Sequence, residues 1–246
     1  MAEYWALYAK KLSSKPPVNQ RVNRLAALGQ VSANIAHEIR NPLGSISLNL
    51  QYLAQQSEVP KIYKTKLRNI ESGVARIQSI VEGILEFIRP NPAHFAGVDI
   101  HRVIDSSIHF VRHEYEHSNL SIKKDYRARA PKTLIDSNQI IQVLVNLFLN
   151  AKDAMSTNGT LAVTTLSDSN TLEVHIQDDG IGISRQDLLR IFEPFFSTKR
   201  KGIGLGLAIV SRVIAEHGGQ IAVESQTGIG TKFIIRLPRP GVKQGG

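Results

Sequence analysis

The stretch that decides the fold is Asn34-Ile35-Ala36-His37-Glu38-Ile39-Arg40-Asn41-Pro42-Leu43. It lies inside a long run of apolar residues that recur at spacings of three and four, which is the pattern of a helix with one buried stripe. The stripe consists of Leu25, Leu28, Val31, Ile35, Ile39, Leu43, Ile46, Leu50 and Leu53. His37 and Glu38 fall off this stripe, so we expect both side chains to face solvent.

The polar residues around His37 are more specific than the histidine itself, because a lone histidine in a helix is usually structural or simply exposed. Glu38 follows it directly, and Asn41 lies four residues on, which places it on the same helix face. Pro42 removes the helical hydrogen bond to the Glu38 carbonyl, and this predicts a kink at the pair His37-Glu38. The polar face favours a functional site over the structural alternative, a plain coiled-coil dimerisation module.

Two long helices are predicted in the first 90 residues, the first over residues 20–57 and the second from after Pro60 to about Arg89. The second helix carries a heptad stripe, which consists of Tyr63, Leu67, Ile70, Val74, Ile77, Val81, Ile84 and Ile88. A hairpin of two such helices cannot bury both stripes alone. We therefore expect it to dimerise into a four-helix bundle with two-fold symmetry.

The chain is predicted to contain two domains. Residues 1–19 are expected to be a tail or the cut end of a sensor linker, and residues 20–90 the helical hairpin. A pair of prolines ends the second helix, which makes residues 91–97 the linker. Residues 98–240 form the second domain, and residues 241–246 are expected to be a disordered tail.

The pattern of the second domain mixes helices with short strands and predicts an α/β layer, a mixed sheet covered on one face by helices. Helices are expected over Ile100–His117, from a cap at Asp136 or Ser137 to Met155, and over Leu205–Glu216, where Gly218-Gly219 ends the helix. Strands are expected at residues 120–124, 133–135, 161–165, 172–177, 220–224 and 232–237.

Composition narrows the class of protein. The 246 residues contain no cysteine, which excludes disulfides, zinc–thiolate sites and thiol catalysis. No apolar run is long enough to span a bilayer and no secretory signal is present, so we expect a cytoplasmic location, with attachment to a longer or membrane-linked parent left open. The net charge of +9 comes from scattered basic residues, which favours an anionic nucleotide or acidic partner over nucleic acid.

The first two of four short motifs in the second domain carry polar groups. Asn146, Asn150 and Asp153 share one helix face, and carboxamide oxygens suit magnesium. Asp178-Asp179-Gly180-Ile181-Gly182 follows a strand, where a carboxylate can accept a hydrogen bond from an exocyclic amine and glycines allow close approach. Each motif alone also has an ordinary interpretation, as a solvent-facing helix or an acidic turn.

The other two motifs read as a lid and a phosphate loop. Phe192-Glu193-Pro194-Phe195-Phe196 is expected to form a loop that closes by apolar packing, and the following Lys199 is placed to meet phosphate. Gly202-Ile203-Gly204-Leu205-Gly206-Leu207 opens a helix, whose free backbone amides suit phosphate oxygens. This loop has neither the spacing of a Rossmann fingerprint nor the Lys-Ser/Thr ending of a Walker loop.

Taken together, these residues resemble the sensor histidine kinases. The string Ala36 to Leu43 is similar to their phosphoacceptor H box, and the four motifs resemble the N, G1, F and G2 boxes of their ATP-binding domain. Gly228-Ile229-Gly230-Thr231 resembles the final glycine turn of that domain. The resemblance covers residues 24–238 and implies a Bergerat-type α/β sandwich after the helical hairpin.

The resemblance implies a homodimeric histidine kinase that uses ATP and Mg²⁺. It would autophosphorylate His37 with help from Glu38 and pass the phosphoryl group to an aspartate of a response regulator, while Asn41 orients water in the reverse dephosphorylation. Asp178 would bind the adenine amino group, and Asn150 and Asn146 would hold the metal. The nucleotide-binding residues that the resemblance implies are Asn146, Asn150, Asp153, Asp178, Gly180, Gly182, Phe195, Lys199, Gly202, Gly204, Leu205, Gly206, Leu207 and Thr231.

Two other classes of protein remain as alternatives. A clamp ATPase of the Hsp90 or gyrase type places a glutamate where Asn146 stands, and a non-catalytic scaffold is expected to show damage in at least one box. We expect the lid, between Ile183 and Lys201, to order around nucleotide. The chain departs from the family pattern at the end of this lid and in the glycine loop that follows it. Ile203 replaces the usual threonine or serine, and the basic run 199–201 is long.

Overall fold

The computed structural model describes residues 39, 41–55, 60–88, 92–199 and 203–239. The chain divides into two units, Met1–Asn91 and Pro92–Gly246. Within the described residues, no helix is both long enough and apolar enough to cross a membrane.

The first unit contains two helical segments. Residues 39 and 41–55 are helical, and helix α3 spans Lys61–Ile88. The Pro60 carbonyl starts α3 by accepting hydrogen bonds from the backbone of Tyr63 and Lys64. Both predicted helices are therefore confirmed over the described residues. The first predicted helix before residue 39, the expected kink at His37-Glu38 and the turn at residues 56–59 lie outside them.

The two helices pack through a small apolar cluster of Leu43, Leu50 and Val74, with Leu67 partly buried against it. Six other members of the predicted stripes are instead 37–55% exposed, namely Ile39, Ile46, Leu53, Tyr63, Ile70 and Ile77. One hairpin buries a single line of each stripe, because each helix has only one neighbour in this chain. This exposure agrees with the expectation that the hairpin cannot bury both stripes alone.

The second unit is built on a five-stranded sheet. Its strand order is β2-β4-β5-β7-β6, in which β2 and β4 run parallel and all other neighbours run antiparallel. The strands are β2 (Ser121–Tyr126), β4 (Thr160–Ser167), β5 (Thr171–Asp178), β6 (Gln220–Gln226) and β7 (Gly230–Pro238). The sheet is mixed, as the sequence predicts, and the expected β4–β5 hairpin is present.

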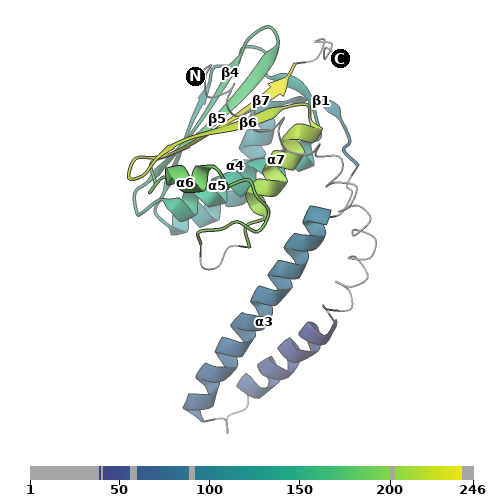
Figure 1. Cartoon of the computed structure of the whole chain (residues 1–246), viewed down its shortest axis with the longest axis vertical. Helices are drawn as coiled ribbons and strands as arrows, with labels where there is room; N and C mark the ends of the chain where they lie inside the picture. The colour runs from purple at the N-terminus through teal and green to yellow at the C-terminus, as the bar shows by residue number, and fades with distance from the viewer. Residues whose placement is uncertain (1–38, 40, 56–59, 89–91, 200–202, 240–246) are drawn as a thin grey trace. The chain divides into compact units, whose positions relative to one another are not determined.

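Three helices cover one face of this sheet (Figure 1): α4 (Ile100–His117), α5 (Ser137–Ala154) and α7 (Gly206–Glu216). In β5, Leu172, Val174 and Ile176 are buried while their neighbours are more exposed, which is the alternation of a strand with one covered face. Asp178 continues this buried row. Because side chains alternate along the strand, the carboxylate of Asp178 lies on the helix-covered side at the end of β5.

The predicted ends of two helices are confirmed. The Asp136 side chain caps α5 by accepting from the backbone N–H groups of Asn138 and Gln139. Helix α7 ends at Glu216, with His217 as its C-cap, and the next residue, Gly218, has a φ of 65°, the left-handed conformation that glycine adopts freely. Both ends are set by local chemistry, which is why the sequence predicts them.

Two short elements were not predicted. Strand β1 (Ala96–Asp99) pairs antiparallel with β3 (Lys132–Ile135), so the expected linker 91–97 is wrong at its C-terminal end. Helix α6 (Arg185–Leu188) forms a single turn inside the expected lid. A four-residue strand that pairs with a partner 36 residues away has no local periodicity to reveal it.

Candidate functional site

A lysine of the lid, Lys199, contacts the polar face of α5. The Nζ atom of Lys199 lies 3.0 Å from Oδ1 of Asn150 and 2.8 Å from Oδ2 of Asp153. Two oxygen atoms from successive turns of α5 thus point at one position where a cation sits. Asn146 lies one turn earlier on the same helix, so the three residues share a face, as their spacing predicts.

Asp178 is the buried carboxylate of the site, with 5% of its surface exposed. Its Oδ1 accepts hydrogen bonds from the backbone N–H of Gly180 at 3.0 Å and of Thr231 at 3.3 Å. Burial raises the pKa of Asp178 above its ordinary value, and the charge of Asp179 adds to this, while the two backbone donors act in the opposite direction. Both bonds end on Oδ1, which directs the carboxylate without using Oδ2.

The neighbouring carboxylate, that of Asp179, makes different hydrogen bonds. Asp179 is exposed, and both of its oxygens accept from the backbone N–H of Thr160, at 2.9 and 3.0 Å. This bond fixes the first residue of β4 to the end of β5. Of the two adjacent acids, only Asp178 is positioned inside the buried row.

At two positions the backbone of another segment comes so close that only glycine fits. A Cβ on Gly182, at φ 69°, would lie 2.1 Å from the Gln226 carbonyl oxygen, and one on Gly204, at φ 76°, would lie 2.5 Å from the Phe196 carbonyl oxygen. The loop after β5 is thereby pressed against β6, and the glycine loop against the lid. Gly180 is also buried, beside the last turn of α5.

Ser225 is a site residue that sequence reasoning missed. Its hydroxyl accepts from the Ile183 backbone at 2.8 Å, donates to the Gly230 carbonyl at 2.8 Å and lies 3.1 Å from the Thr231 hydroxyl. It therefore ties the loop after β5 to the final glycine turn. A single serine in a strand carries no signal; only the register that pairs Ser225 with Thr231 reveals it.

The glycine loop leads into the N-terminus of α7. Leu205 is the N-cap residue, is buried and provides no side-chain cap, so the first N–H groups of α7 have no side-chain partner from it. Gly206 and Leu207 form the first turn, and a Cβ on Gly206 would lie 3.4 Å from Oδ1 of Asn146. The positive end of α7 thus lies beside the polar face of α5, which suits an anion.

The described part of the lid is anchored at its base. Phe195 donates its backbone N–H to the Gly204 carbonyl at 2.9 Å, has a φ of 66° and keeps its side chain 61% exposed. The Arg190 guanidinium lies 4.5 Å from the ring centre of Phe196. The aromatic motif is therefore hydrogen-bonded to the glycine loop through the backbone of Phe195. Phe195 itself has a backbone conformation that non-glycine residues rarely adopt.

The other predicted site residues belong to the first unit or lie outside the described residues. His37, Glu38 and Gly202 are outside the described residues. Asn41 is exposed on the helix of residues 41–55, in the first unit. The second unit brings together Asn146, Asn150, Asp153, Asp178, Gly180, Gly182, Phe195, Lys199, Gly204, Leu205, Gly206, Leu207 and Thr231.

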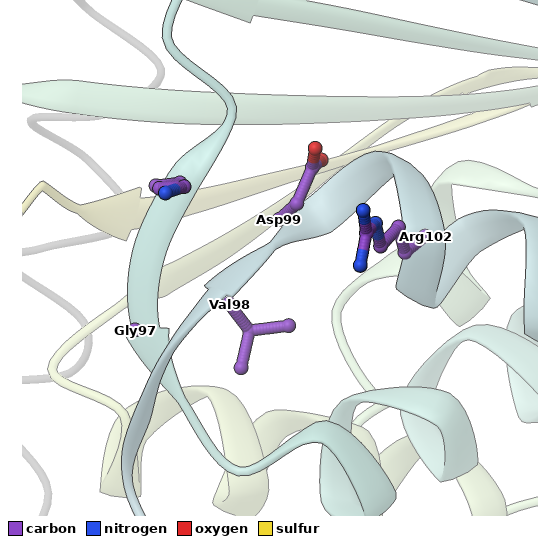
Figure 2. A pocket seen from close by; sticks show the side chains of 5 residues that line it. Gly97, Val98, Asp99 and Arg102 are labelled. Carbon is purple, nitrogen blue, oxygen red and sulfur yellow. The ribbon is translucent and has the colours of Figure 1, made fainter.

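A cavity of about 310 Å³ lies elsewhere, where β1 leads into α4. Figure 2 shows Asp99 and Arg102 at the end of β1 and the start of α4; Gly97, Val98 and Lys132 complete its lining. Asp99 already caps α4 by accepting from the His101 backbone. None of the five lining residues belongs to the motifs, so the convergence of side chains, and not this cavity, defines the candidate site.

Two family models match the chain. Residues 27–92 match the "His Kinase A (phospho-acceptor) domain", and residues 135–241 match the "Histidine kinase-, DNA gyrase B-, and HSP90-like ATPase". The chain belongs to the sensor histidine kinases of two-component systems. The second unit is the ATP-binding domain of such a kinase, and both the resemblance to sensor histidine kinases and the predicted fold class are confirmed.

Relatives with curated names agree with this family. The chain is 33% identical to sensor histidine kinase ZraS of Escherichia coli (strain K12) over 219 residues, which cover 89% of the chain and 47% of ZraS. It is 31% identical to sporulation kinase E of Bacillus subtilis (strain 168) over 233 residues, 93% of the chain and 31% of that kinase. The chain therefore spans about half the length of ZraS and a third of the sporulation kinase.

Solved structures of histidine kinases are also similar. Full-length ShkA in complex with AMPPNP matches with a TM-score of 0.70 and 25% identity, covering 85% of the chain and 45% of ShkA. Histidine kinase ThkA in complex with response regulator protein TrrA matches with a TM-score of 0.66 and 28% identity, covering 90% of the chain and 64% of the solved one.

Proposed function

We propose that the chain is the catalytic core of a dimeric kinase that transfers the γ-phosphoryl group of ATP to His37 and then to an aspartate of a response regulator. The observation that carries the nucleotide half of this proposal is the convergence of Asp178, the α5 face and the N-terminus of α7. The phosphoacceptor half rests on the sequence around His37, which the matched phospho-acceptor domain includes. A kinase that draws on cellular ATP also favours a cytoplasmic position for this core.

The adenine end of ATP is assigned to Asp178. Because Gly180 and Thr231 both donate to Oδ1, the second oxygen, Oδ2, is the one we assign to the exocyclic amino group of adenine. A buried carboxylate with one oxygen held by the backbone is a fixed acceptor, so it selects a ligand that donates at that position. The AMPPNP bound to the similar kinase ShkA supports an adenine nucleotide as the ligand.

The phosphate end is assigned to α5, Lys199 and the start of α7. The Asn150 and Asp153 oxygens already converge on one cation, the Lys199 ammonium, so their donor set suits Mg²⁺, which we assign to Asn150 and to Asn146, one turn earlier on the same face of α5. Bound there, the metal would neutralise phosphate charge. The N–H groups at the start of α7, which receive no side-chain cap from Leu205, and the Lys199 ammonium add donors for the terminal phosphates.

His37 supplies the nucleophile. An unprotonated ring nitrogen attacks the γ-phosphorus, the bond from that phosphorus to the bridging oxygen breaks, and ADP leaves with the electron pair. Glu38 takes or orients the proton on the other ring nitrogen, which offsets the positive charge that develops on the imidazole. Asn41 is exposed and follows His37 by four residues in the sequence, and we assign it to orient water when the same surface dephosphorylates the regulator.

Dimerisation completes the first unit in this proposal. Ile46, Ile70 and Ile77 are about half exposed in one chain, and a second copy that covers them would form the four-helix bundle. The response regulator in complex with ThkA supports such a regulator as the second partner.

The proposed function is tested with γ-labelled ATP and Mg²⁺. We expect label on the protein that acid removes and base does not, as for a phosphoramidate, and its loss in His37→Ala with ATP binding retained. His94→Ala, which removes an exposed histidine of the second unit, serves as the control and should label normally. Acid-labile label that persists in the His37 variant would overturn the assignment.

A further inference from the structure

The last turn of α4 carries a motif that the kinase reaction does not use, His113-Glu114-Tyr115-Glu116-His117. His113 and His117 are four residues apart, so their imidazoles lie on one helix face. Their ring centroids are 5.7 Å apart with the ring planes tilted by 32°, and both side chains are exposed. The spacing H-E-x-x-H on a helix is the one by which two histidines bind a single metal ion.

The helix under this pair is held rigidly. Tyr115 lies between the two histidines in sequence and so points to the opposite side of α4, where it is 2% exposed. Its hydroxyl donates a 2.7 Å hydrogen bond to the Phe148 carbonyl of α5. The backbone that spaces His113 and His117 is therefore fixed from behind, while their rings keep the rotational freedom needed to meet at one ion.

The electrostatics of this position favour a cation. His117 is the last residue of α4 and therefore lies at the negative end of the helix dipole. The Lys152 ammonium forms an ion pair with the Glu114 carboxylate. The charge of Lys152 is thus offset by the acid that lies between the two histidines in sequence.

The motif does not make a hydrolase. In metalloproteases the glutamate of H-E-x-x-H is the general base and a third residue completes the ligand set. Here Glu114 is committed to Lys152, and among the described residues no group of three or more His, Cys, Asp or Glu side chains is placed to hold a metal. The structural alternative is a pair of exposed rings that only complements the helix end.

We propose that His113 and His117 form a two-histidine chelate for a divalent transition metal of the Zn²⁺, Cu²⁺ or Ni²⁺ class, with water as the remaining ligands. Imidazole nitrogen suits these metals, and a shared ion about 2.0–2.1 Å from each nitrogen needs only small rotations of two exposed rings. Such a chelate cross-links the last turn of α4. It stabilises the second unit because it binds the helical state and not the unfolded chain. The inference is independent of phosphoryl transfer.

The test uses the full chain with each metal alone and no nucleotide. Calorimetric titration with Zn²⁺ should show one site per chain, and Zn²⁺ should raise the melting temperature. Electron paramagnetic resonance of bound Cu²⁺ should show splitting from two imidazole nitrogens. Absence of binding in the parent chain, or Cu²⁺ spectra with no histidine nitrogen, would overturn the proposal.

Three variants identify the ligands. His113→Asn and His117→Asn should each weaken Zn²⁺ binding by at least about tenfold, because each removes one of two protein ligands, and should abolish the rise in melting temperature. His109→Asn, an exposed histidine one turn earlier on α4, is the control and should bind as the parent does. Melting temperatures without metal check that all three variants fold. Unchanged affinity in the His113 and His117 variants, or equal loss in the His109 variant, contradicts the chelate.

Discussion

Lys199 Nζ donates a 3.0 Å hydrogen bond to Oδ1 of Asn150, although the two residues are 49 positions apart in the sequence. The same ammonium forms a 2.8 Å ion pair with Asp153. A lid residue therefore occupies the point on α5 that we assign to the metal. A metal ion bound to the same two oxygens would compete with the ammonium for its position, so we expect Mg²⁺ to displace Lys199 towards the phosphates.

The first prediction follows from this competition. Lys199→Met should raise the affinity of the nucleotide-free chain for Mn²⁺, used as a spectroscopic substitute for Mg²⁺, and should lower ATP affinity. The pair is exposed, with side-chain exposures of 40% and 51%, so it contributes below about 1 kcal/mol and the gain in Mn²⁺ affinity should stay within about fivefold. Electron paramagnetic resonance of free Mn²⁺ measures it.

The matched control for that prediction is Lys232→Met. Lys232 pairs with Glu224 across the sheet at 3.8 Å, so the variant removes the same charge without touching α5. It should leave Mn²⁺ affinity unchanged. An unchanged or lower Mn²⁺ affinity in the Lys199 variant would mean that the ammonium and the metal do not compete.

The second prediction concerns Asp178→Asn. The variant keeps an oxygen for the Gly180 and Thr231 donors but replaces Oδ2 with an N–H₂ group, which repels the adenine amino group. ATP affinity should fall about 10- to 100-fold, the range for a lost hydrogen bond to a charged acceptor. Fluorescent-nucleotide titration measures it; affinity within twofold of the parent would remove Asp178 from adenine recognition.

The same substitution makes a prediction about pH. Folding raises the pKa of Asp178, so its ionised form destabilises the folded state at neutral pH, and this cost falls as the pH drops through the raised pKa and vanishes below the unfolded value. Asp178→Asn removes the buried charge and should melt at the same or a higher temperature at pH 7. Its advantage should shrink as the pH is lowered. A variant less stable than the parent at pH 7 would contradict this sign.

The third prediction concerns the cap of α5. Burial opposes ionisation of Asp136, yet hydrogen bonds from the backbone of His94, Gln139 and Asn138 hold its pKa below the usual range. Asp136→Ala should therefore cost about 2 kcal/mol, or roughly 4–8 °C in melting temperature. Asp136→Asn, which keeps one acceptor for the cap, should lose less.

The pH dependence of that cap has the opposite sign to Asp178. A carboxyl whose pKa folding lowers contributes stability above its unfolded value, near 4, and loses it as the pH falls through the folded pKa. The parent chain should lose stability over this acid range, and Asp136→Ala should lose less. Parallel melting curves of the two chains between pH 5 and 3 would contradict the role of the cap.

The fourth prediction tests the dimer. Ile70→Glu and Ile77→Glu place charges on the exposed line of α3, where burying each isoleucine is worth about 1.5–3 kcal/mol. Each variant should raise the dissociation constant of the dimer at least about tenfold in sedimentation equilibrium. Ser72→Glu, exposed on α3 but off the stripe, is the control. A dimer that tolerates both glutamates would show that this line is not the interface.

Prediction from sequence succeeded where the signal was local. The heptad of α3, the cap at Asp136 and the glycine end of α7 each depend on residues within a few positions of one another, and all three are present in the structure. It failed at β1 and Ser225, whose partners Ile135 and Thr231 are set by strand register. The spacing of the motif also could not distinguish the role of Asp178 from that of Asp179.

The sequence by itself determined the family, the two kinds of domain and the motifs that a kinase needs, because residue type and spacing encode helical periodicity and box order. Only the tertiary structure decided which atoms meet. It assigned Oδ1 of Asp178 to two backbone donors, used Asp179 to fix β4 and brought Lys199 to Asn150. These contacts depend on how β5, α5 and the lid pack, and the distances between residues far apart in a chain are fixed by packing and not by spacing.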